Sequence, residues 1–454
     1  MNQTDKQILH IAVPSIVSNI TVPLLGLVDV TIVGHLGSAA YIGAIAVGGM
    51  LFNMIYWVFG FLRMGTGGLT AQAFGQRNEA EITRILLRSL SVSFLLAAAL
   101  LVLQYPIRHL AFFFIDASPE VQDMATRYFH ICIWGAPATL GLYSFIGWFI
   151  GMQNSRYPMF IAITQNVVNI AASLFFVFAL DMKVAGVALG TLIAQYAGLL
   201  MACLLCRHKY KSLRPYVRRH RLFERQAMKR FFNVNRDIFF RTLCIVAVTV
   251  FFTSTGAAYG DVVLAVNTLL MQLFTLFSYV MDGFAYAGEA LSGKYAGAGN
   301  RTAFRQTVRH LFYWGTALAA GFTLLYGIGG KDFLSLLTND TEVISASGDY
   351  FAWVLAIPAA GFSAFLLDGI CIGATATRIM LRAIFIASAC FFLLYYGLHG
   401  TMGNHALWLA FISYLGLRGI MQALLSRKLL SQGFFSTFPL KSQGCQKLSV
   451  KVSH

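Results

Sequence analysis

Asp29 is the residue whose position in the sequence points most directly to chemistry. It lies in a long apolar run, and a charged side chain at the centre of a membrane helix costs about 2.5–3.5 kcal/mol on insertion scales. Such a group persists where it faces a cavity, has polar partners or takes up a proton. Because burial disfavours the charged form of a carboxyl group, Asp29 is suited to load and release a proton or to bind Na⁺. The alternative is a neutral Asp29 that caps or bridges helices.

Three more acidic residues, Asp282, Glu289 and Asp368, are also embedded in apolar sequence. Ionisable groups inside a membrane pair with one another or line a pathway for ions or substrate. Arg63 and Arg241 are available as partners, although the sequence does not assign the pairs. Glu289 is also close to Lys294 in the sequence, so an ordinary surface pair is the alternative there.

The elements that must position these residues are membrane-spanning helices. The chain has 454 residues, of which 57% are hydrophobic and 11% charged, against roughly 25% charged in soluble proteins. Apolar segments of about 20 residues can cross a hydrocarbon core about 30 Å thick, and helices satisfy their own backbone in lipid. We therefore expect an all-α membrane protein with twelve transmembrane helices. The predicted spans are 8–32, 41–68, 82–104, 123–151, 158–180, 184–206, 235–258, 262–291, 304–327, 346–373, 378–400 and 404–430.

The net charge of +16 follows the topology, so we do not expect a nucleic-acid partner. Every second connection is basic, and the largest basic cluster lies at 207–234. The positive-inside rule then predicts that both termini, the 207–234 linker and the 431–454 tail are cytoplasmic, in the inner (plasma) membrane. The linker is either a solvated tether or a contact for anionic lipid headgroups.

The two halves of the chain match each other at a nearly constant shift. Between residues 69 and 159 the shift is +222, so Gly75 corresponds to Gly297 and Gly151 to Gly373. The repeat predicts two six-helix bundles, an N-lobe at 1–206 and a C-lobe at 235–430. Many transporters build a cavity between two such halves.

Polar residues in neighbouring spans lie at depths that match Asp29. At about 1.5 Å per residue, Asn169 falls near the middle of its span and Thr191 in the outer part of the next. Asn166 lies one turn before Asn169 on the same face. Their oxygens can hydrogen-bond a carboxyl group or ligate Na⁺. The alternative is ordinary hydrogen bonding between membrane helices.

Four segments together resemble the multidrug and toxic compound extrusion (MATE) family, within it the DinF-like branch. They are Leu27 to Gly37, Gly60 to Gly75, Asp282 to Ala290 and Phe365 to Ala374. The resemblance implies a two-lobed antiporter in which entry of H⁺ or Na⁺ drives an amphipathic organic substrate out by alternating access. Asp29, Asn169 and Thr191 match the family's N-lobe cation site. Ser173 stands where the family often has a second acid, which favours H⁺ over Na⁺.

The resemblance also implies roles for further residues. Pro14 matches a proline at which the first helix is thought to bend, although a static kink fits the sequence equally well. Asp368 matches a position implicated in cation coupling. The residues that are expected to line the substrate cavity, unless they simply pack, are Tyr143, Trp148, Met152, Tyr286 and Glu289. The alternative function is a flippase for a lipid-linked precursor; a receptor or channel would not need twinned halves with buried acids.

No motif indicates an enzyme or a cofactor. The Gly65–Gly68 run lacks a P-loop lysine and follows no strand, so nucleotide binding is unsupported. Cys203 and Cys206 have redox spacing, but they end a membrane helix without a βαβ unit. We therefore expect a monomeric transporter in membrane lipid that is driven by an ion gradient or by a partner ATPase.

Overall fold

The computed structural model describes residues 2–34, 38–114, 118–217, 222–338 and 340–432, and the described part of the chain is helical, without strands. The first bundle contains α1 (Gln3–Gly34), α2 (Ala39–Val58), α3 (Phe61–Gly75), α4 (Glu79–Val102), α5 (Gln104–Phe114), α6 (Pro119–Cys132), α7 (Ala136–Gly151), α8 (Arg156–Leu174) and α9 (Lys183–Lys209). The second contains α10 (Arg225–Ala258), α11 (Asp261–Gly297), α12 (Arg301–Leu337), α13 (Thr341–Gly373), α14 (Thr377–Met402) and α15 (Asn404–Gln432).

These helices form the twelve predicted spans, six in each bundle. Eleven are long and apolar enough to cross a membrane by length and composition, within the described residues; α1, with 32 residues, is the remaining one. Two spans of the first bundle are interrupted. α2 and α3 are separated at Phe59–Gly60, and α6 and α7 are joined by a 3-10 turn at Ile133–Gly135. α8 ends in a π-helical turn at Phe175–Ala179.

The internal repeat is visible in the caps that begin the helices. Asn78 accepts a hydrogen bond from the backbone N–H of Glu81 at the start of α4, and its counterpart Asn300 caps α12 in the same way. Ser118 and its counterpart Asp340 cap α6 and α13. A cap satisfies an otherwise unpaired donor of the first turn. The same local chemistry therefore starts corresponding helices in both halves.

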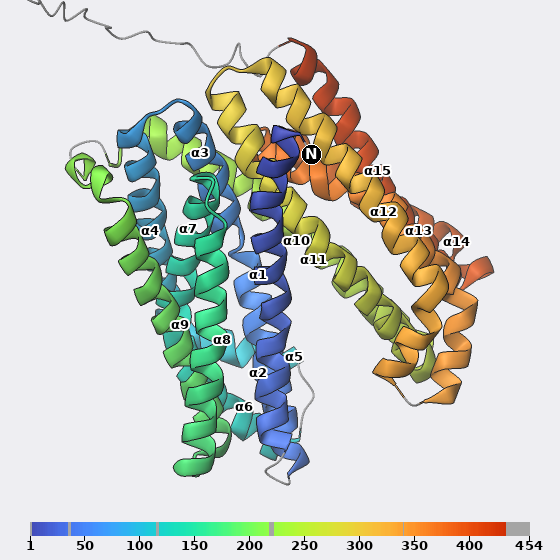
Figure 1. Cartoon of the computed structure of the whole chain (residues 1–454). Helices are drawn as coiled ribbons and strands as arrows, with labels where there is room; N and C mark the ends of the chain where they lie inside the picture. Colours follow the sequence, from blue (N-terminus) through green and yellow to red (C-terminus); the bar gives the residue numbers. More distant parts are fainter. Residues whose placement is uncertain (1, 35–37, 115–117, 218–221, 339, 433–454) are drawn as a thin grey trace, which may run out of the picture.

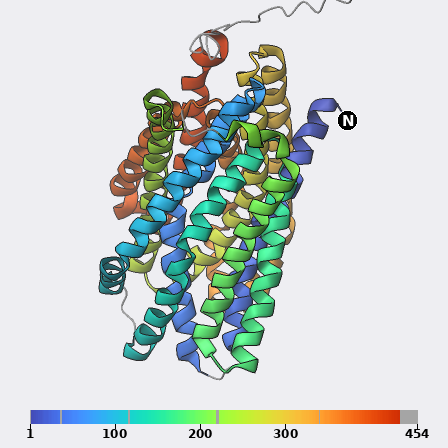
Figure 2. The ribbon, with the colours of Figure 1, turned by 90° about the vertical axis from the view of Figure 1, so that its left-hand side faces the viewer.

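The two bundles lie against each other at one end and diverge toward the other (Figure 1). We call the shared end, which carries the start of α1 and the start of α10, the basic end. The helices of the first bundle run side by side along the long axis (Figure 2). At the basic end, α3 crosses α11 so closely that a Cβ on Gly75 would lie 2.9 Å from the Ala298 nitrogen. A Cβ on Gly297, the counterpart of Gly75, would lie 2.9 Å from the Gln72 Cα.

Three details differ from the expectation. The amphipathic helix α5 lies between the third and fourth spans, where we expected only a connection. α10 begins at Arg225, inside the predicted 207–234 linker, and a short 3-10 helix, Lys211–Tyr216, occupies part of the remainder. The linker is also attached to the first bundle, because Arg88 Nε donates to the Leu222 carbonyl at 2.6 Å. Of the predicted tail, residues 433–454 lie outside the described residues.

Candidate functional site

Asp29 and two of its predicted partners form a hydrogen-bonded chain in the first bundle. Thr191 Oγ1 on α9 donates to Asp29 Oδ2 at 3.3 Å, and Asn169 Nδ2 on α8 donates to Thr191 Oγ1 at 3.0 Å. Asp29 is 4% exposed and Asn169 is fully buried. Since α8 packs against both α1 and α9, three helices fix this geometry. Asp29, Thr191 and Asn169, which the depth argument placed near one another, are thus in contact.

The hydrogen-bonded cluster around Asp29 leaves several oxygen atoms without a hydrogen-bond partner. Among the described residues, Asp29 Oδ1, Asn169 Oδ1 and Ser173 Oγ are buried and make no hydrogen bond. Buried polar atoms are normally paired, so this cluster has spare capacity for a proton or a cation. Asn166 does not join it, because its amide donates to the Ala162 carbonyl of its own helix at 3.0 Å.

Tyr128 on α6 is a neighbour that sequence reasoning missed. Its phenol lies near Thr191 and Asp29. The ring fits because α2 has a glycine opposite it: a Cβ on Gly48 would come within 2.9 Å of the Tyr128 ring. A tyrosine followed by an apolar run looks like an ordinary packing residue, and only the Gly48 contact marks its place.

α1 continues as one helix through Pro14 and Pro23. Proline has no backbone N–H, so Pro14 leaves the carbonyl of His10, four residues earlier, without its helical donor. Ser155, which is fully buried at the start of α8, supplies the missing donor, since its Oγ lies 3.2 Å from the His10 oxygen. The first proline of α1 is therefore tied to the first bundle by a replacement hydrogen bond.

Replacing Ser155 by alanine should destabilise the protein by about 0.5–1.5 kcal/mol, because the hydrogen bond to the carbonyl of the exposed His10 is lost. The cost should shrink in a Pro14→Ala background, where the alanine N–H can bond to His10. The measurement is a double-mutant cycle of thermal unfolding midpoints in one detergent. Strictly additive effects of the two substitutions would contradict the replacement bond.

Asp368 in the second bundle is tied on both carboxylate oxygens. Arg241 and Arg418 both donate to Asp368 Oδ2, and Gln422 donates to Oδ1 at 2.5 Å. All four side chains are buried. Two guanidinium groups around one carboxylate favour its charged form. This geometry is that of an ion-pair cluster that braces α10, α13 and α15, and it does not favour Asp368 as a group that takes up a cation.

An Asp368→Asn substitution should therefore weaken folding, by about 3–5 kcal/mol, because it leaves two buried arginines with one neutral partner. Size-exclusion profiles and thermal unfolding of the purified protein would report the loss. The matched control is Asp349→Asn, an exposed acid on the same helix, which should unfold like the wild type. Equal stability of the two variants would show that the cluster is dispensable.

Three of the expected cavity residues gather around Arg63 on α3. Its guanidinium lies 4.2 Å from the centre of the Tyr286 ring, and Nη1 lies 3.4 Å from Glu289 Oε2. Tyr143 interacts electrostatically with Arg63 and Tyr286. Arg63 and Tyr143 belong to the first bundle, and Tyr286 and Glu289 belong to the second. The contact therefore joins the two bundles.

The other two expected cavity residues lie elsewhere. Trp148 is buried in the first bundle, where its indole N–H donates to the Ile82 carbonyl at 3.1 Å. Met152 lines a separate cavity of about 550 Å³ at the basic end, together with Phe74, Tyr210 and Lys294.

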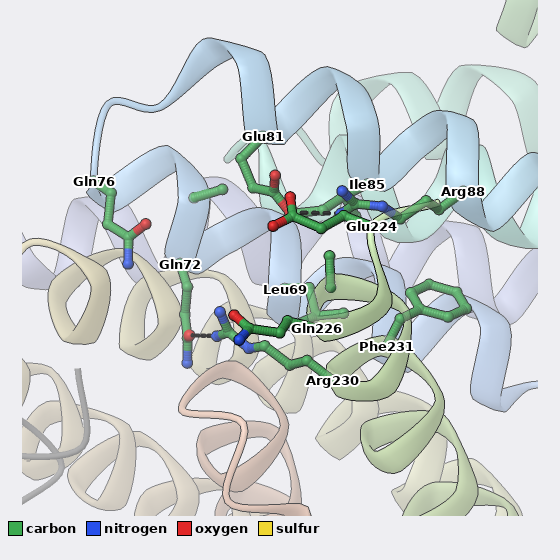
Figure 3. A pocket seen from close by; sticks show the side chains of 12 residues that line it. Leu69, Gln72, Gln76, Glu81, Ile85, Arg88, Glu224, Gln226, Arg230 and Phe231 are labelled. Carbon is green, nitrogen blue, oxygen red and sulfur yellow. Dashed lines mark hydrogen bonds and ion pairs between the residues drawn. The ribbon is translucent and has the colours of Figure 1, made fainter. Parts of the chain in front are cut away.

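A second cavity at the basic end, of about 380 Å³, lies where α3 and α4 meet α10 (Figure 3). Gln72 bridges the bundles beside it. It accepts from Arg230 at 2.6 Å and donates to the Gly373 carbonyl at 3.0 Å and to Thr375 at 3.1 Å. Arg88 pairs with Glu81 on the far side of the cavity at 2.6 Å. Polar bridges thus help to close the basic end.

The internal repeat is also recognised by the profile of a known family. The sequence profile of the MatE family matches residues 14–175 and again 238–396. The chain belongs to the MATE family. The two matched ranges are shifted by close to the +222 of the internal repeat, so one profile recognises both halves. As a MATE protein, the chain is a multi-pass membrane transporter of the class that exports drugs and toxic compounds.

Within the family, the chain lies in the DinF-like branch. It is 37% identical to DNA damage-inducible protein F of Escherichia coli (strain K12) over 432 residues, which cover 94% of this chain and 93% of that protein. Its fold resembles a mutant of the Vibrio cholerae MATE transporter VcmN, with a TM-score of 0.83, 17% identity and coverage of 94% and 97%. It also resembles a multidrug resistance MATE transporter in an outward-facing conformation, with a TM-score of 0.81, 17% identity and coverage of 95% and 96%.

Proposed function

We propose that this MATE transporter exports amphipathic organic compounds in exchange for H⁺, with Asp29 as the group that binds the proton. The observation that carries the proposal is the buried Asp29 carboxylate, whose Oδ2 accepts from Thr191 while Oδ1 has no partner among the described residues. A proton on Asp29 would turn one carboxylate oxygen into a donor. Asn169 Oδ1 and Ser173 Oγ are buried oxygens that lack a donor.

H⁺ fits this site better than Na⁺. Asp29 is the single acid among Asn169, Thr191 and Ser173, and in the described part of the chain no three His, Cys, Asp or Glu side chains gather as a metal site. Na⁺ would have to be held by one carboxylate and neutral oxygens, which is a weak set for a cation. A proton requires only that the carboxyl group change its hydrogen bonds.

α1 offers a route from Asp29 to the other bundle, because its two ends belong to different cores. Ile8 and Ile11 lie in the core of the second bundle, while Ile32 and Val33 lie in a core of the first. At its start, Asp5 accepts from His310 at 2.8 Å and from Trp314 at 3.1 Å. The hydrogen bond from His310 lowers the pKa of Asp5, which lies outside the span.

Protonation of Asp29 would therefore act on a helix that both bundles hold. Neutralising the carboxyl group changes its bonds to Thr191 at one end of α1, and the first turns carry the change to α11 and α12. Pro14 lies between these two attachments, where a missing backbone bond lowers the cost of bending. We propose that bending there accompanies the alternation between the two open states.

The described conformation corresponds in this proposal to the outward-open state. The bundles meet at the basic end, which the positive-inside rule assigns to the cytoplasm together with both termini. They diverge at the opposite end (Figure 1). We further propose that the protein acts as a monomer in the inner (plasma) membrane and needs no cofactor beyond the coupling ion.

The test is transport by the purified full-length protein in lipid vesicles. Under an imposed pH gradient, we expect ethidium to move against the proton flux and the gradient to dissipate faster than in empty vesicles. Replacing the pH gradient by a Na⁺ gradient should abolish this movement. Transport driven by Na⁺ alone would reverse the choice of ion. Movement of labelled lipid without ethidium would indicate a flippase instead.

A further inference from the structure

We propose that Tyr286 and Glu289 form a binding site for the cationic group of the transported compound, and that Arg63 occupies this site in the conformation described. Arg63 would then act as a built-in competitor that displaces the compound each time the bundles close. The inference rests on the proposed function in that it assumes alternation between two open states. The coupling ion and Asp29 do not enter it.

The first support is the geometry of the contact. Arg63 places its guanidinium over an aromatic face, 4.2 Å from the Tyr286 ring centre, and beside a carboxylate, 3.4 Å from Glu289 Oε2. A ring face next to a carboxylate is the combination that recognises organic ammonium and guanidinium ions. Tyr286 and Glu289 are thus arranged to bind a cation, and the cation that they bind here is the Arg63 side chain.

The second support is that the site has more acceptors than Arg63 uses. Glu289 is 1% exposed, and its Oε1 has no hydrogen-bond partner among the described residues. This oxygen faces α3 at Gly67, since a Cβ on that glycine would lie only 3.1 Å from the Glu289 carboxyl carbon. A buried carboxylate oxygen without a donor has unused hydrogen-bonding capacity, which a different cation can fill once α3 has moved away.

The third support is a stripe of residues on one face of α11. Asp282, Tyr286 and Glu289 are four and three residues apart, so they lie on the same side of the helix. Asp282 is half-buried and interacts electrostatically with Arg63. Two acids and a ring therefore face one arginine of the opposite bundle. A compound that enters along this stripe meets a second carboxylate about two turns from the first.

The position of Arg63 determines the side of the membrane toward which the displaced compound leaves. Arg63 lies twelve residues before the end of α3, roughly 18 Å from the basic end, and its partners lie on α11. If the bundles separate at the basic end, α3 moves away from α11 and withdraws the guanidinium. Tyr286 and Glu289 then face the cytoplasmic side without a cation. When the bundles close again, Arg63 returns to the ring and the carboxylate, and the bound cation must leave toward the other side.

The experiment is equilibrium binding of ethidium to the full-length protein in lipid nanodiscs, followed by fluorescence anisotropy with empty nanodiscs as the blank. An Arg63→Ala variant should bind ethidium more tightly, because the apparent affinity of the wild type is reduced by the fraction of molecules in which Arg63 occupies the site, about tenfold for an occupancy of about nine in ten. Arg63→Lys, which keeps a tethered cation, should bind like the wild type. Methylguanidinium at millimolar concentration should compete with ethidium in Arg63→Ala and not in the wild type.

The Glu289→Gln substitution tests whether the Glu289 carboxylate binds the cationic group of ethidium. Added to Arg63→Ala, it should return ethidium binding to the wild-type level or below. If Arg63→Ala does not fold, the proposal can be tested with Arg63 left in place. Spin labels at the exposed positions Glu79 and Gln306 should move apart when ethidium is added, and Glu289→Gln should suppress this change. Unchanged affinity in a folded Arg63→Ala protein, or equal ethidium binding by Glu289→Gln and the wild type, overturns the proposal and leaves Arg63 as a latch between the bundles.

These results are separable from a failure of the proposed function. Binding in nanodiscs needs no gradient, so a vesicle experiment without H⁺ coupling would reject the role of Asp29 and leave the cation site standing. Conversely, H⁺-driven transport together with unchanged affinity in Arg63→Ala would reject the competitor alone.

Discussion

An Asp29→Asn variant is expected to lose gradient-driven export while remaining folded. Asparagine keeps an oxygen at the position that accepts from Thr191 (3.3 Å in the present structure), so the stability should change by no more than about 1 kcal/mol. The amide cannot take up a proton at physiological pH. In vesicles with an imposed pH gradient, efflux of ethidium should fall to the level of vesicles without protein.

The matched control is Asp181→Asn. Asp181 is exposed in the connection between α8 and α9, and its backbone has a φ of 50°, a conformation that asparagine adopts as readily as aspartate. This variant removes one negative charge outside the buried chain, so it should transport like the wild type. Full efflux by Asp29→Asn under the same gradient would remove the proton-binding role from Asp29 and with it the proposed coupling.

The helices were predictable because each is encoded by local sequence. Apolar runs of spanning length located all twelve, and repeated caps such as Asn78 and Asn300 start corresponding helices. The helix α5 was missed because its eleven residues are too few to span, so a search for apolar runs passes over it. The early start of α10 was missed because a basic, polar first turn resembles a linker until it packs.

The contacts of the site were predictable where the depth of a residue along its helix is enough to identify its neighbours. Asp29, Asn169 and Thr191 lie at similar depths on packed helices, and counting residues was enough. Depth does not give the direction of a side chain, and Asn166 therefore failed to join the chain although it lies one turn away. Contacts that depend on the crossing of distant helices, such as Arg418 with Asp368 or Ser155 with His10, leave no local signal in the sequence.

The repeat also shows where the two bundles differ. Its glycines, Gly75 and Gly297, occupy equivalent places on α3 and α11 and allow the same close crossing from both sides. The buried acids of the two bundles, in contrast, do not occupy equivalent positions in the repeat. The Asp29 cluster in the first bundle has unpaired oxygens, whereas Asp368 in the second is bound by Arg241, Arg418 and Gln422. The shared scaffold supports symmetric motion, while the chemistry proposed for coupling is confined to one bundle.

Replacing Gly75 by leucine should block transport by preventing closure at the basic end. A Cβ at this position would lie 2.9 Å from the Ala298 nitrogen and 2.8 Å from the Lys294 carbonyl carbon. Backbone atoms cannot yield as a flexible side chain does, so overpacking should oppose this conformation by about 1–3 kcal/mol, which changes the equilibrium constant for closure by a factor of about 5 to 150. Leucine is a better helix former than glycine, so α3 itself should remain helical.

Gly297→Leu tests the same crossing from the other bundle, because its Cβ would lie 2.8 Å from the Gln72 carbonyl carbon. Both variants should lose at least about four-fifths of the efflux rate, in line with the shift in population. Hydrogen exchange should rise in residues 66–75 and 290–297, which the closed crossing buries. Gly321→Ala on α12, where an added Cβ meets nothing within 4 Å, should leave both measurements unchanged. Normal transport by both leucine variants would mean that α3 and α11 need not approach this closely during the cycle.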